Sequence, residues 1–143
     1  MADTFSHYKA GLGSVGSYQV SGKPFVSGAI DVNDATVAGT PLEITFPSVT
    51  RWILVRNLDN SADNSKTIKV AASATGFDNN NFFTLNDDYS GTFIRKSTTP
   101  RLELKLTKIY LTGSSTKVDV IAGLTNIPIN TIPDNWEGSD GVG

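Results

Sequence analysis

The sequence predicts an all-β fold: a single jelly-roll-like β-sandwich of about eight short strands with extended N- and C-terminal arms. Three observations predict this class. Apolar and polar residues alternate in short runs through the middle of the chain, turn-forming residues separate these runs, and no segment has a helical period. Several expected loops are longer than two residues, which favours a jelly-roll or Greek-key arrangement over a simple meander.

The 143 residues suffice for one domain. We assign residues 1–23 to an N-terminal arm, residues 24–124 to the β-sandwich domain and residues 125–143 to a C-terminal arm. Both arms are rich in Gly, Ser, Pro and Asn, and neither has a hydrophobic period that could build a core. The sequence therefore predicts a rigid body with two segments that reach neighbouring molecules.

The first strands are predicted from alternation. Residues 25–30 form a short candidate, and residues 42–46 alternate Leu, Ile and Phe with Glu and Thr. Residues 52–57 are apolar at nearly every position, which indicates a central strand covered on both faces. Residues 67–72 alternate again, so this strand has one buried and one exposed face.

The later strands follow the same logic. Residues 82–85 and 89–95 are two short candidates. Residues 102–111 alternate with a change of phase near Thr107, which indicates a bulge. Residues 113–116 have the composition of a hairpin loop, which leads into a last strand with its apolar residues at every second position.

Composition narrows the function classes. The chain has no cysteine, which excludes disulfides, thiolate zinc sites and a cysteine nucleophile. A net charge of −2 gives no electrostatic reason to expect nucleic-acid binding. We expect no membrane span and no signal peptide, and therefore a protein that stays in the cytoplasm where it is made.

The charge is unevenly distributed along the chain. Residues 51–108 contain nine Lys or Arg and six Asp or Glu, a balance of +3, whereas residues 109–143 contain one Lys and four Asp or Glu, a balance of −3. The basic region of one molecule could meet the acidic tail of a neighbour. Ordinary solvation of the surface is the alternative explanation.

The motifs that suggest chemistry lack its structural context. Residues 11–16 fit G-x-G-x-x-G, but no strand precedes them and no helix follows, so we expect no dinucleotide site. His7 is the only histidine and lies in the N-terminal arm, whereas a serine triad needs a histidine held by a carboxylate in a shaped site, so we expect His7 to make a surface contact. The Asp and Asn clusters have turn composition and no EF-hand spacing. We expect no catalytic residues, no metal and no cofactor.

Large apolar side chains in the arms are the candidate partner-binding residues. An aromatic residue on a polar tail typically anchors in a pocket, and such residues dominate interface energies. For Trp136 the alternative is packing back on its own domain. The prolines beside the isoleucines indicate an extended, stiffened strap. The candidates are Tyr8, Tyr18, Phe25, Ile127, Ile129, Ile132 and Trp136.

Four stretches in this order resemble a known family: residues 15–25, 44–50, 52–57 and 120–128. The chain is similar over residues 11–138 to small virion structural proteins of tailed bacteriophages, particularly those of marine and cyanobacterial phages. The resemblance implies a jelly-roll that coats or cements the capsid, often as a trimer between major capsid subunits. It supplies no catalytic residues.

We therefore expect a capsid decoration protein, not an enzyme, that binds the major capsid protein and itself as a homotrimer. It would assemble in the host cytoplasm and reside on the capsid surface of the virion. One alternative is a structural protein of the neck or tail, such as a collar or fibre-attachment module. Another is a carbohydrate-binding module with a platform of Tyr89, Phe93 and Tyr110.

Overall fold

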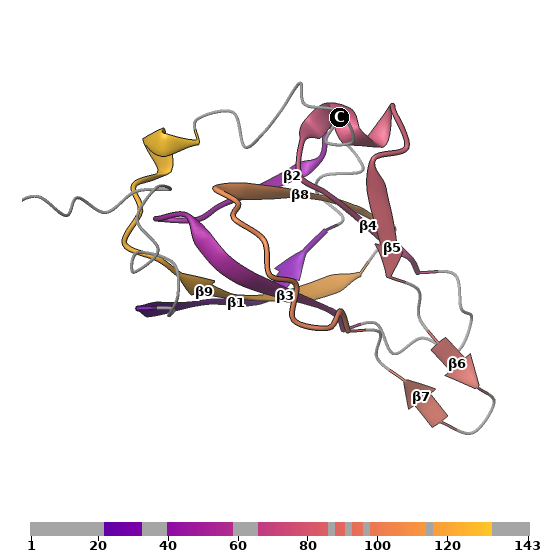
Figure 1. The fold of residues 1–143 in the computed structure, drawn as a ribbon. Coiled ribbons are helices and arrows are strands. Elements are labelled where there is room, and N and C mark those ends of the chain that lie inside the picture. Colours follow the sequence, from indigo (N-terminus) through magenta and orange to yellow (C-terminus); the bar gives the residue numbers. More distant parts are fainter. Residues whose placement is uncertain are drawn as a thin grey trace, which may run out of the picture.

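The computed structural model describes residues 22–32, 40–58, 66–85, 98–113 and 116–132, together with the backbone of two further strands at 88–90 and 93–95. The described residues form nine short strands and two short 3-10 helices, which Figure 1 draws in their spatial arrangement. In chain order they are β1 (Lys23–Asp31), β2 (Leu42–Thr45), β3 (Thr50–Asn57), β4 (Ile68–Ala71), η2 (Ala74–Phe77), β5 (Phe82–Leu85), β6 (Asp88–Ser90), β7 (Phe93–Arg95), β8 (Lys108–Gly113), β9 (Lys117–Leu124) and η3 (Ile129–Thr131).

Two antiparallel sheets form the body of the molecule. One has the strand order β1-β9-β3 and the other has the order β2-β8-β4-β5. The two sheets lie as separate layers in Figure 1. The connections from β1 to β2, from β2 to β3, from β3 to β4 and from β8 to β9 each pass from one sheet to the other. An all-β sandwich, as predicted, is therefore confirmed.

A short extended segment adds a fourth member to the smaller sheet. Thr98 forms an isolated bridge with Arg56, and Leu102 forms one with Ile53. Segment 98–102 thus lies beside β3, so each sheet has four members. With this segment counted, the two orders and their crossing connections are those of an eight-stranded jelly roll.

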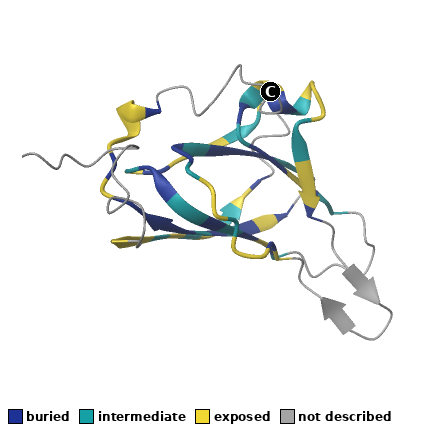
Figure 2. Cartoon of the chain, viewed as in Figure 1, coloured by how far each residue is buried: buried dark blue, intermediate teal, exposed yellow. Residues whose placement is uncertain are grey.

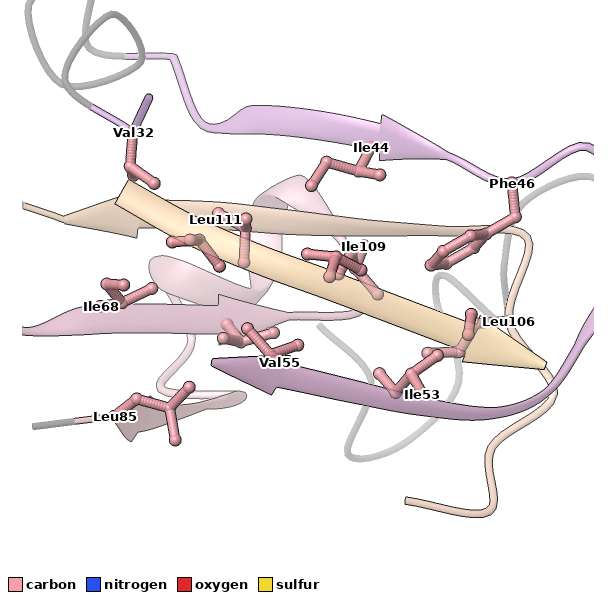
Figure 3. Close-up of a cluster of buried hydrophobic side chains, with 14 of the residues drawn as sticks. Val32, Ile44, Phe46, Ile53, Val55, Ile68, Leu85, Leu106, Ile109 and Leu111 are labelled. Atoms are coloured by element: carbon pink, nitrogen blue, oxygen red, sulfur yellow. The ribbon is translucent and has the colours of Figure 1, made fainter. Parts of the chain in front are cut away.

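The core lies between the two sheets. Its side chains come from both sheets and include the fully buried Phe46, Ile53, Ile109, Leu111 and Val120 (Figure 3). In Figure 2, buried residues lie along the strands of both layers. Alternation explains this placement, since every second residue of a strand points to the same face. In β4, Ile68 and Val70 are buried and Lys69 is exposed, as predicted.

β3 differs from its prediction in an informative way. Its apolar run indicated a strand covered on both faces. Ile53 and Val55 are buried in the core, but Trp52 and Leu54 on the opposite face are only half-buried. One face of the run is thus covered by the sandwich, and the other still reaches solvent.

The predicted hairpin at residues 113–116 is wrong. β8 and β9 belong to different sheets, so they do not pair as a hairpin. Gly113 approaches the neighbouring backbone so closely that a β-carbon there would lie 2.7 Å from the Thr67 carbonyl oxygen. Turn-forming composition predicts a change of direction but does not say which strands pair.

Two further strand predictions need correction. Residues 102–106 alternate as a strand would, but they form only the bridge at Leu102, and β8 begins at Lys108 after a bend at Thr107. The single strand expected at 89–95 is instead two strands, β6 and β7, paired with each other. β6 ends at Ser90 and β7 begins at Phe93.

A β-bulge bends β1. Its register with β9 shifts between Ser27 and Ile30, so Gly28 and Ala29 lie opposite the single residue Asp119. Ala29 has a φ of 52°, and its amide donates a hydrogen bond of 2.9 Å to the Asp119 carboxylate. The carboxylate satisfies an amide that leaves the strand ladder at the bulge.

The folded body extends beyond residue 124, where the predicted C-terminal arm begins. Ile127 and Ile132 are buried with Val49 in a second, smaller cluster. The Val49 amide donates to the Ile127 carbonyl at 3.0 Å, and the Thr125 amide donates to the Val49 carbonyl at 2.9 Å. Residues 125–132 therefore close one end of the sandwich, and only residues 133–143 of this arm lie outside the described chain.

Candidate partner-binding surfaces

The predicted partner-binding residues fall into three groups. Tyr8, Tyr18 and Trp136 lie outside the described residues. Phe25 is half-buried and packs edge-on against Phe46, with ring centroids 5.1 Å apart and an interplanar angle of 83°. Its ring thus contributes to the domain core, so its main contact is internal.

The three isoleucines near the C-terminus differ in how far their side chains are exposed. Ile127 and Ile132 are core residues, with 0% and 4% of their surface exposed, so neither side chain is available to a partner. Ile129, in η3, is 40% exposed. It lines a surface cavity of about 290 Å³ with Glu43, Thr45, Thr107, Lys108 and Asn130. Of the three side chains, only that of Ile129 is accessible to a partner.

The outer face of the β1-β9-β3 sheet is unexpectedly apolar. Val26, Ile121 and Leu54 are direct neighbours across the three strands, because Ile121 pairs with Val26 on one side and with Leu54 on the other. In the next row, Gly123 lies between Pro24 and Trp52. None of these side chains belongs to the core clusters. We call Pro24, Val26, Trp52, Leu54 and Ile121 the apolar face.

The exposure of this face is what makes it a candidate site. Val26 is 68% exposed, the largest value among the large hydrophobic residues that the structure describes. Outward positions of a sandwich normally alternate to polar residues, because they meet water. A contiguous exposed apolar patch with a polar rim is typical of a protein–protein interaction surface.

Charged side chains form the rim of the apolar face. The Arg101 guanidinium lies 5.9 Å from the centre of the Trp52 ring. Glu103 contacts Arg101 at 2.7 Å and Arg51 at 3.5 Å. A carboxylate held by two arginines has a structural role, so Glu103 gives no support to acid–base chemistry at this rim.

A second apolar site opens at one edge of the sandwich. A cavity of about 360 Å³ lies where β5 and the segment 104–106 face each other across the two layers. Phe83 and Leu104 flank it, with 37% and 41% of their surfaces exposed. Asn80 and Asn81 supply polar groups to its wall. A concave site of this size and composition suits a large apolar side chain or a small ligand.

The outer face of the β2-β8-β4-β5 sheet is polar at one end. Glu43 and Tyr110 lie directly opposite each other on β2 and β8. Hydrogen bonds from Tyr110 and Thr45, together with Lys108, hold the pKa of Glu43 below its usual range, whereas burial raises the pKa of Tyr110. Lys108 contacts Glu43 at 3.7 Å and lies 5.5 Å from the centre of the Tyr110 ring.

The predicted sugar-binding platform is not found as expected. Tyr110 is 7% exposed, so its ring cannot present a flat surface to a sugar. The side chains of Tyr89 and Phe93 lie outside the described residues. Among the aromatic residues with described side chains, Phe83 is the one with a substantially exposed ring.

Metal sites and membrane-spanning helices are two further possibilities. Within the described ranges, no three His, Cys, Asp or Glu side chains gather closely enough to hold a metal ion. No described helix is long and apolar enough to cross a membrane.

The apolar face was missed at the sequence level, although a signal for it existed. Val26, Leu54 and Ile121 occupy every-second-residue positions opposite in phase to the core residues of their strands. That phase predicts an outward direction. Only the strand register, which depends on long-range pairing, brings the three side chains into one row.

Comparison of the chain with protein-family models, with curated proteins and with solved structures found no match.

Proposed function

We propose that this chain is a structural protein of a virion that decorates and cements the capsid shell by binding major capsid protein subunits. The apolar face is the observation that carries the proposal. Trp52 and Leu54 of β3 and Ile121 in the centre of β9 remain half-exposed on the outside of the sandwich. Covering such a face requires another protein surface.

The rest of the molecule supports the same role. Many weak contacts add up when a shell carries many copies of one protein, so a modest apolar face on each copy is sufficient for firm attachment. The jelly roll also occurs in viral capsid domains, although a fold by itself does not define a function. The resemblance over residues 11–138 names the same class. In this proposal the protein forms a homotrimer, has no cofactor and is not an enzyme.

The number of copies per purified particle tests the location. On the order of hundreds of copies, measured by quantitative mass spectrometry, are expected for a shell protein whose contacts are multiplied over the surface. About six to a few tens of copies would place the protein at the neck or tail, where symmetry allows few positions. Absence from the particle would overturn the proposal.

A matched pair of variants tests the apolar face. Val26→Lys places a charge on the most exposed apolar residue and should abolish binding to shells that lack the protein. Thr84→Lys adds the same charge at an exposed position of β5 in the other sheet and should leave binding unchanged. Normal attachment of Val26→Lys, with a normal melting temperature, would show that this face does not bind the shell.

Sugar binding is a second candidate, favoured by one observation. The cavity of about 360 Å³ combines the rings of Phe82 and Phe83 with the side chains of Asn80 and Asn81. Apolar surface with a few polar groups is the usual composition of a small-ligand site. Binding to a glycan array that is lost in Phe83→Ala and retained in Val26→Lys would favour this function over shell attachment.

A further inference from the structure

β5 forms one edge of the four-stranded sheet. It pairs with β4 on one side, and no other described strand pairs with it on the second side. On the second side of an edge strand, the backbone amides and carbonyls have no partner in the sheet, so another chain can pair with them. β5 therefore has the backbone groups to which an extended segment can add as a further strand.

The other edges of the sandwich carry features that hinder such pairing. Charged residues, prolines and bulges are the usual ones. β1 contains Pro24 and a bulge, and β2 contains Glu43. Segment 98–102, at the edge beside β3, contains Pro100 and Arg101. β5 has the sequence FFTL and pairs with β4 without a register shift, so it has none of these features.

The sandwich is open beside this unprotected edge. Phe83 lies directly opposite the buried Val70, so its ring points to the core side of the sheet, yet 37% of its surface is exposed. Leu104 is 41% exposed and lines the same cavity of about 360 Å³. The cavity extends from these two residues to Ile53 and Ile109, which belong to the core. An apolar opening therefore lies next to the free edge of β5.

A strand added to β5 would direct a side chain into this opening. Residues that lie opposite each other on neighbouring strands point to the same face of a sheet. The residue opposite Phe83 would therefore point to the core side, as Phe83 and Val70 do. A cavity of about 150 Å³ is enough to bind benzene. The larger cavity beside β5 has room for a side chain of the size of Leu or Phe.

The wall of the cavity is fixed by contacts of its own. The Asn81 amide donates to the Gly76 carbonyl at 2.8 Å, and a β-carbon at Gly76 would lie 2.9 Å from the Asn81 carbonyl oxygen. Within the described chain, the side-chain amides of Asn80 and Asn81 make no hydrogen bond. Both residues line the cavity, so their side chains are available to the backbone of an incoming segment.

Charge indicates the composition of that segment. Lys69 is exposed between the buried Ile68 and Val70, so it lies on the outer face of β4. Its ammonium lies 4.5 Å from the centre of the Phe82 ring, which places the charge over β5. Among the described residues, Lys69 has no acidic partner. A carboxylate on the outer face of an added strand would complement this charge.

We propose that an extended segment of a partner protein adds to the free edge of β5 as a fifth strand of this sheet. One of its apolar side chains fills the cavity, and an acidic residue next to it in the segment lies on the outer face beside Lys69. A second copy of β5 does not meet these requirements, because Phe82–Leu85 contains no acidic residue. The inference is independent of the proposed function, since the apolar face belongs to the other sheet.

Binding of synthetic peptides to the full-length protein tests the proposal. The probes are capped peptides of about eight residues with Phe, Leu or Ile at every second position and Glu or Thr between them. We expect peptides with Glu to bind with dissociation constants below about 1 mM. Leu104→Glu should weaken binding at least about tenfold, whereas Ile129→Glu, at an equally exposed residue, should not change it. No binding by any peptide, or normal binding by folded Leu104→Glu, would overturn the proposal.

Lys69→Glu tests the expected charge without touching the core. This variant should exchange the preference for peptides with Glu for a preference for peptides with Lys. An unchanged preference would contradict the predicted contact with Lys69, and it is informative even if Leu104→Glu does not fold. A dimer of the free protein that Leu104→Glu or Lys69→Glu dissociates would overturn the proposal in favour of a second copy.

N-methylation of the peptides separates strand addition from insertion of a side chain alone. Successive residues of a strand direct their amides to opposite sides, so only one alternate set of amides meets β5. Methyl groups on that set should abolish binding, and methyl groups on the other set should leave it unchanged. Binding that tolerates both sets would show that the peptide fills the cavity without joining the sheet, which would overturn the proposal.

Discussion

The two outer faces of this sandwich differ in how far their outward side chains contact one another and in how polar they are. On the four-stranded sheet, outward residues such as Glu43, Thr45 and Lys108 contact one another, and η2 packs closely against Ala71. On the three-stranded sheet, the outward residues of the row Val26, Ile121 and Leu54 are all apolar. One face is completed by contacts among its own side chains, and the other keeps apolar side chains exposed or half-exposed.

The same contrast exists within the single strand β3, where alternate residues face the core and the outside. Ile53 and Val55 of β3 face the core, and Trp52 and Leu54 face outward from the same strand. The two sets are equally apolar in sequence. Only the side of the sheet on which each lies distinguishes a buried core residue from one that stays half-exposed.

The largest expected effect comes from a side chain that faces the core between the two sheets. Leu111 is fully buried, so Leu111→Ala should lower the free energy of unfolding by about 2–5 kcal/mol through lost burial and a cavity. Leu54→Ala, on the apolar face, should cost about 1 kcal/mol or less. Urea denaturation measures both. Equal losses would show that Leu54 is a core residue and that the apolar face is covered within the molecule.

The second prediction concerns the end of the sandwich. Ile127→Ala removes a fully buried side chain from the small cluster with Val49 and Ile132 and should cost about 2–3 kcal/mol. Ile129→Ala is the control, because its side chain is 40% exposed and should cost much less. Thermal unfolding of the two variants gives the comparison, and a smaller loss for Ile127→Ala than for Ile129→Ala would contradict it.

The third prediction concerns the polar end of the apolar face. Asp119→Ala leaves the Ala29 amide of the bulge without its carboxylate acceptor and should cost about 1 kcal/mol. Asp119→Asn keeps an acceptor oxygen at the same position and should retain most of the stability. Chemical denaturation of the two variants tests the role of the bulge, and identical losses would show that charge, not the hydrogen bond, matters there.

The smallest expected effect concerns Glu43, on the polar outer face of the four-stranded sheet. The pKa of Glu43 lies below its usual 4.5, so its stabilising contribution is fully present above about pH 4.5 and is lost as the pH falls through the lowered pKa. The loss should be below about 1 kcal/mol, because the carboxylate is nearly half exposed. Glu43→Gln should remove this part of the pH dependence. An unchanged profile between pH 5 and pH 2 would contradict the assignment.

The strand predictions rest on the local alternation of apolar and polar residues. β1, β2, β4 and β5 lie close to their predicted positions, because period-two patterns mark a strand with one buried face. The same pattern failed at residues 102–106, where the alternation is present but only Leu102 forms a bridge. Alternation tells which side of the chain is buried and does not guarantee a neighbouring strand.

The candidate sites were less predictable than the strands. Ile127 and Ile132 looked like strap residues because prolines separate them, and they became core residues because Val49 lies beside them. Val26 and Leu54 looked like ordinary strand residues and became the centre of the apolar face. In each case the deciding neighbour lies far away in the sequence, so no local pattern could identify it.

The sequence by itself determined that the chain is all-β, that it contains no thiol chemistry, and which residues of most strands face inward. These properties follow from composition and from a two-residue period, which are local. The tertiary structure decided that β8 and β9 belong to different sheets, that Val26, Ile121 and Leu54 form one row, and that Ile127 and Ile132 are buried with Val49. Those outcomes depend on which strands pair and in what register, which is set by packing two sheets over a shared core.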